Sequence, residues 1–489
     1  MLRAITLDPS SGPRTRESGS TTAAFQGGPS RRDNLALAPS LLSSMPFEKM
    51  PRLSPRLLVL GSVALLASGA ACSSTDSANP SNDGGPDRDT GTDAGIDTGV
   101  DAGPRCGDGI INGYSEECDL GGGEHPGCDA KCQVPEITIS VSEVSSYDLG
   151  PAIAASPAGG YVVAWATSDK RIVARRLNAN GVPIGDEQRL DSFDNAEYLT
   201  SRTMNLTASP DGFLASWIRN EPRLRAMSLE GTVLGDGEHT LSSEDSSSIS
   251  DYGVTLSHKG HGYSVLHYDF PKRGFVPTDI SPEGVPGASG DPVMTFGAAR
   301  GVDGLATAAM PDGSTVVAWK EFPTTGNPGP MQVRAALVRD GKAAWTATLG
   351  EPSSPGVPAV AVSNEGKILV VWREEPTSGM NDHVIGAWLE PDGRPAGRSE
   401  VCDSESVSIP SVTHSTSGGF LVTVDGHGKR FTSKGEALDS EPFQLTSAST
   451  RPQAPNAVPG PDGTFMVVYR TKDPYAIRAR LLPRDFRIR

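Results

Sequence analysis

The sequence predicts an all-β fold built from seven similar units. Gly160 opens a short apolar stretch that ends at Trp165, and six later stretches repeat this pattern in degenerate form. The seven stretches end at positions 165, 217, 267, 319, 372, 424 and 469, which gives steps of 52, 50, 52, 53, 52 and 45 residues. A repeat of this length is typical of proteins made of stacked or ringed units.

Composition agrees with this prediction and excludes one class of function. The 489 residues include 56 Gly and 40 Pro, and only 6% are aromatic, which favours many short strands joined by turns. The formal net charge is −16. Proteins that bind nucleic acid need clustered Lys and Arg to neutralise phosphates, so we expect no nucleic-acid partner.

The chain begins with two segments that we expect to lie outside the mature fold. Residues 1–49 have no periodicity and are expected to be disordered or to precede the true translation start. Residues 50–72 contain Arg52 and Arg56, an apolar run at 57–66, small residues and then Cys72. This order is typical of a secretory signal, and the run is too short to span a membrane.

The end of this signal resembles the cleavage site of bacterial lipoproteins, although Gly69 stands where that family prefers Leu. The resemblance implies that Cys72 becomes the lipidated first residue of the mature protein. The membrane contact would then be through lipid alone, at the outer membrane or cell surface. Ordinary cleavage near Ala70 or Ala71, which would release a secreted protein, is the alternative.

Two short segments separate the signal from the repeats. Residues 73–105 are a low-complexity linker with seven aspartates and few basic residues, so we expect an extended tether. Residues 106–135 contain four cysteines, and a module this small needs two disulfides in place of a hydrophobic core. The cysteines are Cys106, Cys118, Cys128 and Cys132. Three pairings are open, and zinc binding is the rival interpretation.

The Cys-Gly-Asp-Gly opening and the Glu-Cys-Asp sequence of this module resemble a short cysteine-rich repeat of exported myxobacterial proteins. Leu120 departs from that pattern, which usually has a second Asp there. Four polar residues of the module, Asp108, Asn112, Glu117 and Asp119, could gather a calcium ion. We favour turn and backbone hydrogen bonds for them, and predict no metal and no cofactor.

Residues 136–489 carry the seven repeats, each predicted to form four antiparallel strands. The anchor strands are apolar on both faces, because Tyr161, Val163 and Trp165 alternate with apolar residues. A sheet buried on both faces fits a radial blade, whereas a sandwich has one polar face. Third strands should lie farther out and present arginines. The chain ends soon after the last third strand, and a spare strand at 137–141 could complete that blade and close the ring.

These features predict a seven-bladed β-propeller, and the repeats resemble those of secreted bacterial seven-bladed propellers. That resemblance implies a fold and no activity. No catalytic motif is present, so we predict no catalytic residue. His267 replaces an anchor aromatic residue and is expected in the core, while His258 and His414 lie on inner strands. The leading hypothesis is a monomeric, non-catalytic binding module for an unknown protein or glycan.

Two alternatives stay open. One is a propeller glycan hydrolase or lyase with carboxylates in the channel, and the other is a structural envelope protein. The candidates for a binding site are the long connections after the second strands of the fourth and fifth repeats. Binding residues often lie on such loops, because the rigid scaffold holds the loops in position. The candidate residues on them are Phe322, Glu374, Glu375, Met380, Asp382 and His383.

Overall fold

The fold is described from a computed structural model of the whole chain. The chain divides into two units, Met1–Ala67 and Ser68–Arg489, and every described residue belongs to the second. The described residues are 106–111, 116–119, 121, 127–141, 143–144, 150–191, 204–219, 221–241, 254–258, 261–298, 300–324, 329–352, 354–375, 382–404, 409–415, 417, 419–446, 452–472 and 474–484. The predicted signal, Cys72 and the acidic linker lie outside them.

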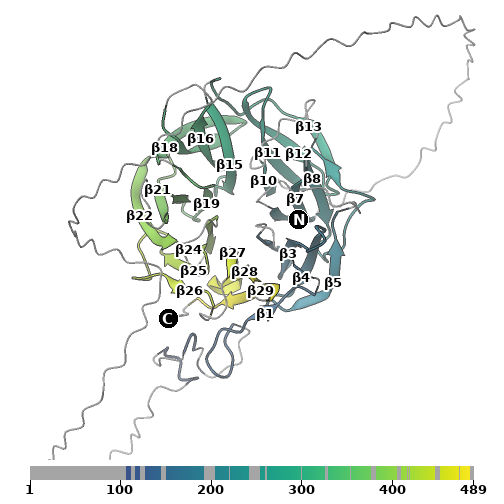
Figure 1. The fold of residues 1–489 in the computed structure, drawn as a ribbon, viewed down its shortest axis with the longest axis vertical. Coiled ribbons are helices and arrows are strands. Elements are labelled where there is room, and N and C mark those ends of the chain that lie inside the picture. Colours follow the sequence, from purple (N-terminus) through teal and green to yellow (C-terminus); the bar gives the residue numbers. More distant parts are fainter. Residues whose placement is uncertain are drawn as a thin grey trace, which may run out of the picture. The chain divides into compact units, whose positions relative to one another are not determined.

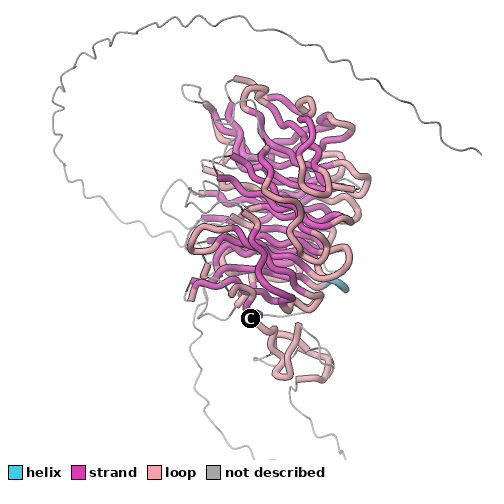
Figure 2. The backbone as a smooth tube through the Cα atoms, turned by 90° about the vertical axis from the view of Figure 1, so that its right-hand side faces the viewer, coloured by secondary structure: helices cyan, strands magenta, loops and turns pink. Residues whose placement is uncertain are grey.

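The described chain forms a seven-bladed β-propeller, as the repeats predicted. Seven antiparallel sheets are arranged in a ring (Figure 1), and strands account for almost all regular structure (Figure 2). The first strands of neighbouring blades contact one another all the way around the ring. Among the described residues, no helix is long and apolar enough to cross a membrane.

The strands are numbered along the chain, and each blade is given from its inner strand outward. The first three blades are β2 Ala152–Ala155, β3 Tyr161–Ala166, β4 Ile172–Leu177 and β5 Pro183–Arg189; β6 Asn205–Ser209, β7 Gly212–Arg219, β8 Glu221–Met227 and β9 His239–Thr240; β10 Val254–His258, β11 Tyr263–Asp269, β12 Gly274–Ile280 and β13 Pro286–Ser289. A short extra strand, β14 Met294–Thr295, also pairs with β12 and makes the third blade five-stranded.

The remaining blades follow the same order. They are β15 Arg300–Ala309, β16 Thr315–Pro323, β17 Gln332–Arg339 and β18 Lys342–Gly350; β19 Ala359–Val362, β20 Ile368–Glu374, β21 Asp382–Leu389 and β22 Pro395–Ser404; β23 Ser411–Ser415, β24 Gly419–Val424, β25 His427–Phe431 and β26 Phe443–Gln444; β27 Gln453–Pro459, β28 Phe465–Lys472, β29 Tyr475–Leu482 and β1 Ile137–Thr138. A 3-10 turn, η2 Pro461–Gly463, joins β27 to β28.

The ring closes as the spare strand predicted. Strand β1 pairs antiparallel with β29, with Ile137 opposite Ala479 and Thr138 opposite Arg478. The backbone N–H groups of Ile139 and Ser140 both donate to the carbonyl of Ile477, which extends the contact beyond the strand. The outer edge of the last blade is therefore covered by a segment that precedes the first blade.

Both faces of the second strands are buried, which confirms the argument for radial blades. Val162 and Ala164 pack toward Phe213 of the second blade, whereas Val163 and Trp165, on the opposite face of β3, pack toward the seventh blade. Each fully buried apolar side chain of this size contributes about 1.5–3 kcal/mol. The cores between neighbouring blades thus hold the ring together.

The expectation that third-strand arginines face solvent is wrong for two of them. Arg225 on β8 and Arg480 on β29 are buried, at 9% and 5% exposure. Both side chains lie between blades, where backbone carbonyls accept hydrogen bonds from them. Apolar periodicity places these strands correctly but does not show which of their polar side chains the neighbouring blade covers.

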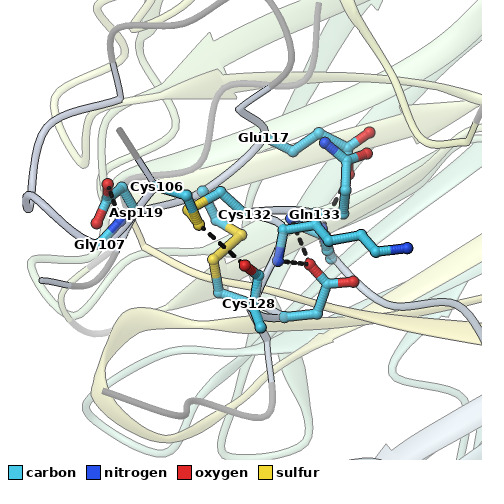
Figure 3. Close-up of a disulfide and its surroundings, with 12 residues drawn as sticks. Cys106, Gly107, Glu117, Asp119, Cys128, Cys132 and Gln133 are labelled. Carbon is cyan, nitrogen blue, oxygen red and sulfur yellow. Dashed lines mark hydrogen bonds between the residues drawn. A yellow bond between two sulfur atoms is a disulfide. The ribbon is translucent and has the colours of Figure 1, made fainter. Parts of the chain in front are cut away.

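The cysteine-rich module contains two disulfides, Cys106–Cys132 and Cys118–Cys128, the second nested within the first (Figure 3). The Asp119 carboxylate accepts backbone N–H groups from Gly107, Asp108, Gly109 and Gly121 at 2.8–3.1 Å. Burial would raise the pKa of Asp119, but these four donors outweigh burial and lower it. The ionised carboxylate therefore organises the start of the module.

The module packs against the seventh blade. Cys118, Cys128, Cys132 and Val134 share one buried core cluster with blade residues that include Tyr469. The Arg480 guanidinium on β29 donates to the carbonyl of Val134 and to the carboxylate of Glu117, which lies in the module. The module and the closing blade are thus joined by apolar and by charged contacts.

Candidate functional site

The two faces of the propeller are built differently. On one, here called the turn face, first strands join second strands and third strands join fourth strands. In the first blade, Gly181 at φ 78° donates to the Asn178 carbonyl at 3.0 Å, and the Asn178 N–H donates to Val182 at 2.9 Å. Most third-to-fourth connections repeat this turn, including those at Gly231, Gly284, Gly393 and Gly435. The turn face therefore offers little variation for recognition.

On the opposite face, here called the loop face, second strands join third strands and each blade joins the next. The candidate binding residues belong to this face, because β16 and β20 end there and β17 and β21 begin there. Met380 lies outside the described residues. The other five candidates are described, and each has partners within the protein.

Phe322, next to the last residue of β16, lies against the inner strand of its own blade. It is paired in register with Gly301, and its ring lies where a side chain on Gly301 would be, 2.5 Å from the position a Cβ would take. The ring is half-buried rather than fully exposed. Only glycine at position 301 allows this packing, so the ring edge is fixed at the rim of the fourth blade.

Glu374 ends β20 and is bound from two sides. Its carboxylate accepts the indole N–H of Trp372 at 2.8 Å and a guanidinium N–H of Arg398 at 2.6 Å. The Arg398 guanidinium also lies over the Trp372 ring, 5.5 Å from its centroid. This geometry fixes the Glu374 carboxylate beside Trp372 in the fifth blade.

The other fifth-blade candidates form a small charged network. Arg373 donates to Asp382 at 2.7 Å and to Glu375 at 2.5 Å, so one guanidinium links the two ends of the connection. His383 lies 2.9 Å from Glu400 through its Nδ1 atom. Glu375 and His383 keep 45% and 34% of their side-chain surface exposed, so both can still contact a ligand.

Sequence reasoning missed the residues that carry the same arrangement in the fourth blade. The Glu321 carboxylate accepts hydrogen bonds from Arg300 at 2.7 Å, from Arg334 at 3.0 Å and from the Trp319 indole at 3.4 Å. Burial would raise the pKa of Glu321, but the hydrogen bonds from the two arginines outweigh burial and lower it. A Trp-x-Glu spacing at 319–321 and 372–374 was the available signal, since residues two apart share a strand face.

The calcium candidates of the cysteine-rich module are arranged as follows. Asn112 lies outside the described residues. Asp119 is surrounded by backbone donors, Asp108 accepts the N–H of Ile110, and Glu117 accepts from Val134 and Arg480. Among the residues that the structure describes, no group of three or more His, Cys, Asp or Glu side chains is placed to hold a metal ion.

The histidines occupy inner and core positions. His267 is 3% exposed, and burial lowers its pKa. His414 lies edge-on against Phe420, with ring centroids 4.7 Å apart, and its Nε2 atom is 3.1 Å from the Ser433 hydroxyl. Burial also lowers the pKa of His414. The side chain of His258 lies outside the described residues.

Comparisons with known proteins find similarity in fold. No protein-family model matches the chain, and no curated protein matches its sequence. An alpha-L-arabinanase of Penicillium chrysogenum complexed with arabinobiose matches at 11% identity and a TM-score of 0.44, over 71% of this chain and 98% of that chain. The WD40 domain of Toxoplasma gondii coronin matches at 9% identity and a TM-score of 0.46, over 72% and 85%.

The Kuenenia stuttgartiensis hydrazine synthase matches at 11% identity and a TM-score of 0.46, over 70% of this chain and 98% of that chain. At such low identity the similarity concerns the propeller fold alone, and function has to be argued from this chain's own residues.

Proposed function

We propose that this protein is an exported, non-catalytic binding module that presents the loop face of its propeller to a protein or glycan partner. The supporting observation is that the described carboxylates on the loop-face ends of the fourth and fifth blades are all engaged. Glu321, Glu374, Glu375 and Asp382 each accept hydrogen bonds from arginine. Each of these acids is therefore already held by a partner within the protein.

This pairing argues against glycoside hydrolysis at the same place. A hydrolase of this type needs two carboxyl groups about 5–10 Å apart, one of which keeps its proton because its pKa is raised. Glu321 has a lowered pKa, and it is held by Arg300 and Arg334. A carboxylate held in this way is suited to fixing the wall of a site and not to donating a proton.

The rim is suited to a polar partner with some apolar surface. Phe322 offers the edge of a ring, and Glu375 and His383 offer partly exposed polar groups on the neighbouring blade. Aromatic rings beside hydrogen-bonding groups on a rigid scaffold are common in binding surfaces. We infer that the fourth and fifth blades make the first contact with the partner.

A matched pair of variants tests this proposal. The loop-face variant is Glu375→Gln with His383→Gln, and the turn-face control is Asp392→Asn with Arg394→Gln, which removes an exposed ion pair of 2.6 Å. Wild type and both variants are used as baits against a glycan array and an envelope-protein extract. We expect wild type and control to capture the same partner, and the loop-face variant to bind it at least about tenfold more weakly.

Two outcomes would overturn the proposal. Equal capture by both variants would place the binding surface elsewhere. Release of reducing sugar from any array glycan by the wild-type protein would show a hydrolase, which is the alternative function.

Export and lipid attachment are part of the same proposal. Two disulfides in the folded chain support an oxidising compartment, because such bonds rarely persist in the cytosol. The proposed anchor is a lipid on Cys72. Mass spectrometry of the mature N-terminus, purified from cells that express the full gene, should show a diacylated or triacylated Cys72 that Cys72→Ser abolishes. An unmodified N-terminus at Ala71 would mean a secreted protein.

A further inference from the structure

The anchor tryptophans of the fourth and fifth blades share a carboxylate partner. Trp319 and Trp372 each donate their indole N–H to the glutamate two residues later, Glu321 or Glu374. Residues two apart on a strand lie on the same face, so this glutamate is always beside the indole. An arginine of the same blade completes the arrangement in both, Arg334 from the adjacent strand β17 and Arg398 from β22, two strands away.

The second blade has the tryptophan but not the glutamate. Arg219 occupies the position two residues after Trp217. Trp217 is 2% exposed, and within the described chain its Nε1 atom has no hydrogen-bond partner. Arg219, 1% exposed, uses Nη2 to donate to Asp191 and to the Lys170 carbonyl, while its Nε and Nη1 atoms have no acceptor among the described residues.

A second buried arginine extends this set of donors. Arg225 lies opposite Ala215 on the same face of the blade as Trp217. It donates Nη2 to the Gly235 carbonyl at 3.0 Å, whereas Nε and Nη1 find no acceptor in the described structure. Three buried side chains of one blade therefore direct unused donors into the same face.

One acid lies nearby without filling the gap. The Glu238 side chain is 3% exposed, and its nearest basic atom, Nη1 of Arg223, is 3.8 Å away, beyond hydrogen-bond distance. Neither oxygen of Glu238 accepts a hydrogen bond from the described residues. Burial raises the pKa of Glu238, and the nearby Arg223 opposes that rise. Glu238 and Asp236 act on Arg225 electrostatically, but the Nε1 atom of Trp217 and the Nε and Nη1 atoms of Arg225 donate no hydrogen bond to either carboxylate.

The face in question is covered by the first blade. Trp217 packs in one core cluster with Ala166 and Ile172 of that blade. Asp191, whose side chain is fully buried, follows the last strand of the first blade and pairs with Arg219 at 3.2 Å. Trp217 and Arg219 are 2% and 1% exposed, so water reaches their unused donors poorly.

We propose that the unused buried donors of Trp217, Arg219 and Arg225, between the first and second blades, bind a small carboxylate anion of the size of formate or acetate. The anion would accept from Trp217, Arg219 and Arg225, as Glu321 accepts from Trp319, Arg300 and Arg334 in the fourth blade. Charge-assisted hydrogen bonds of this kind are the strong ones. Burial of all three donors restricts the site to a small anion.

The first blade supplies the contrast. The Trp165 Nε1 atom likewise has no partner in the described structure, and Thr167 follows it two residues later. Arg175, which lies opposite Val163 as Arg225 lies opposite Ala215, donates Nε to the Gly185 carbonyl and Nη1 to the Ile139 carbonyl. We infer no anion there, because Thr167 stands where the second blade has Arg219, and carbonyls already accept from both Nε and Nη1 of Arg175.

Thermal unfolding of the full chain tests the proposal. Formate or acetate is exchanged for 2-(N-morpholino)ethanesulfonate, an anion too large for the site, at constant pH and ionic strength. A ligand that binds only the folded state raises Tm. We expect Tm to rise with formate and to saturate in wild type and in the control Trp165→Phe, and the rise to be lost in Trp217→Phe and in Arg225→Gln.

Two results would contradict the proposal. The proposal fails if formate leaves the wild-type Tm unchanged, or if Trp217→Phe and Arg225→Gln respond as strongly as wild type. If both variants fail to fold, isothermal titration of the wild-type protein with formate decides. A saturable heat supports the site, and its absence means that water or Glu238 satisfies these donors.

Discussion

The fourth and seventh blades have the same four-stranded architecture but different origins in the chain. The strands β15 to β18 of the fourth blade come from one continuous stretch, Arg300 to Gly350. The seventh blade takes β27 to β29 from the end of the repeats and β1 from a segment more than 300 residues earlier. Its buried Arg480 reaches Val134 and Glu117 across 346 and 363 positions.

This difference shows where the ring is vulnerable. Each hydrogen bond of the Glu321 network in the fourth blade joins residues at most 21 positions apart, so local strands alone bring it together. The seventh blade forms only when the whole ring has been built and its ends meet. The last strand of the repeats, β29, contacts the disulfide-bonded module through Arg480. The module therefore helps to close the ring and is not merely a spacer.

The largest expected effect comes from removing the closing strand. Deleting residues 136–144 removes β1 and Ile139, which is fully buried, and exposes the outer edge of β29. Exposed sheet edges pair with other chains. We expect aggregation or a large fall in Tm, measured by calorimetry and size-exclusion chromatography. Deleting residues 80–88 of the linker is the control, and an equal fall in Tm there would contradict the argument.

A single substitution in the seventh blade should cost more than its counterpart in the fourth. Arg480→Met leaves the carbonyls of Val134 and Leu445 without their buried donor and is expected to lower the free energy of unfolding by about 3–5 kcal/mol. Arg334→Met leaves Glu321 paired with Arg300, and about 1 kcal/mol is expected. Urea unfolding measures both, and equal losses would remove the distinction between the blades.

The smallest expected effect is a difference in alkaline stability. Burial raises the pKa of Tyr469, and its hydrogen bond to Glu136 adds to the rise. Above pH about 10 an unfolded tyrosine loses its proton while the buried one keeps it, so stability present below that pH is lost as pH rises. Tyr469→Phe should cost about 1 kcal/mol at pH 7 and flatten this loss.

The matched control for this prediction is Tyr161→Phe, in the first blade. Burial raises the pKa of Tyr161 to about 12, and its hydroxyl has no hydrogen-bond partner among the described residues. This variant should flatten the alkaline loss without the cost at pH 7. An equal loss of unfolding free energy at pH 7 in both variants would mean that the hydrogen bond to Glu136 does not contribute to stability.

Much of the fold follows from local pattern. The spacing of the anchor strands predicted the number of blades, and the spare strand at 137–141 predicted the closure, because both depend on apolar residues close together in sequence. The extra strand β14 was missed, since Met294–Thr295 is too short to carry a period. The packing of Cys118 against the seventh blade was also missed, because the contact joins residues distant in sequence.

The contacts of the candidate residues could not be predicted from the sequence. Loop length indicated the fourth and fifth blades, yet the partners of Glu374 and Asp382 depend on arginines whose orientation the sequence does not show. Glu321 was overlooked although its spacing from Trp319 was visible. The sequence signal was a glutamate two residues after an anchor tryptophan. This spacing stands out only when the fourth and fifth blades are compared, because both contain it.

The most direct test of the closure account is the effect of the disulfides on the propeller. All six tryptophans lie in the blades, so tryptophan fluorescence reports propeller unfolding alone. In Cys118→Ser with Cys128→Ser, the account predicts a propeller less stable by about 2–4 kcal/mol in urea, with a single transition. A propeller that unfolds at the wild-type urea concentration without this disulfide would contradict the claim that the module helps to hold the ring closed.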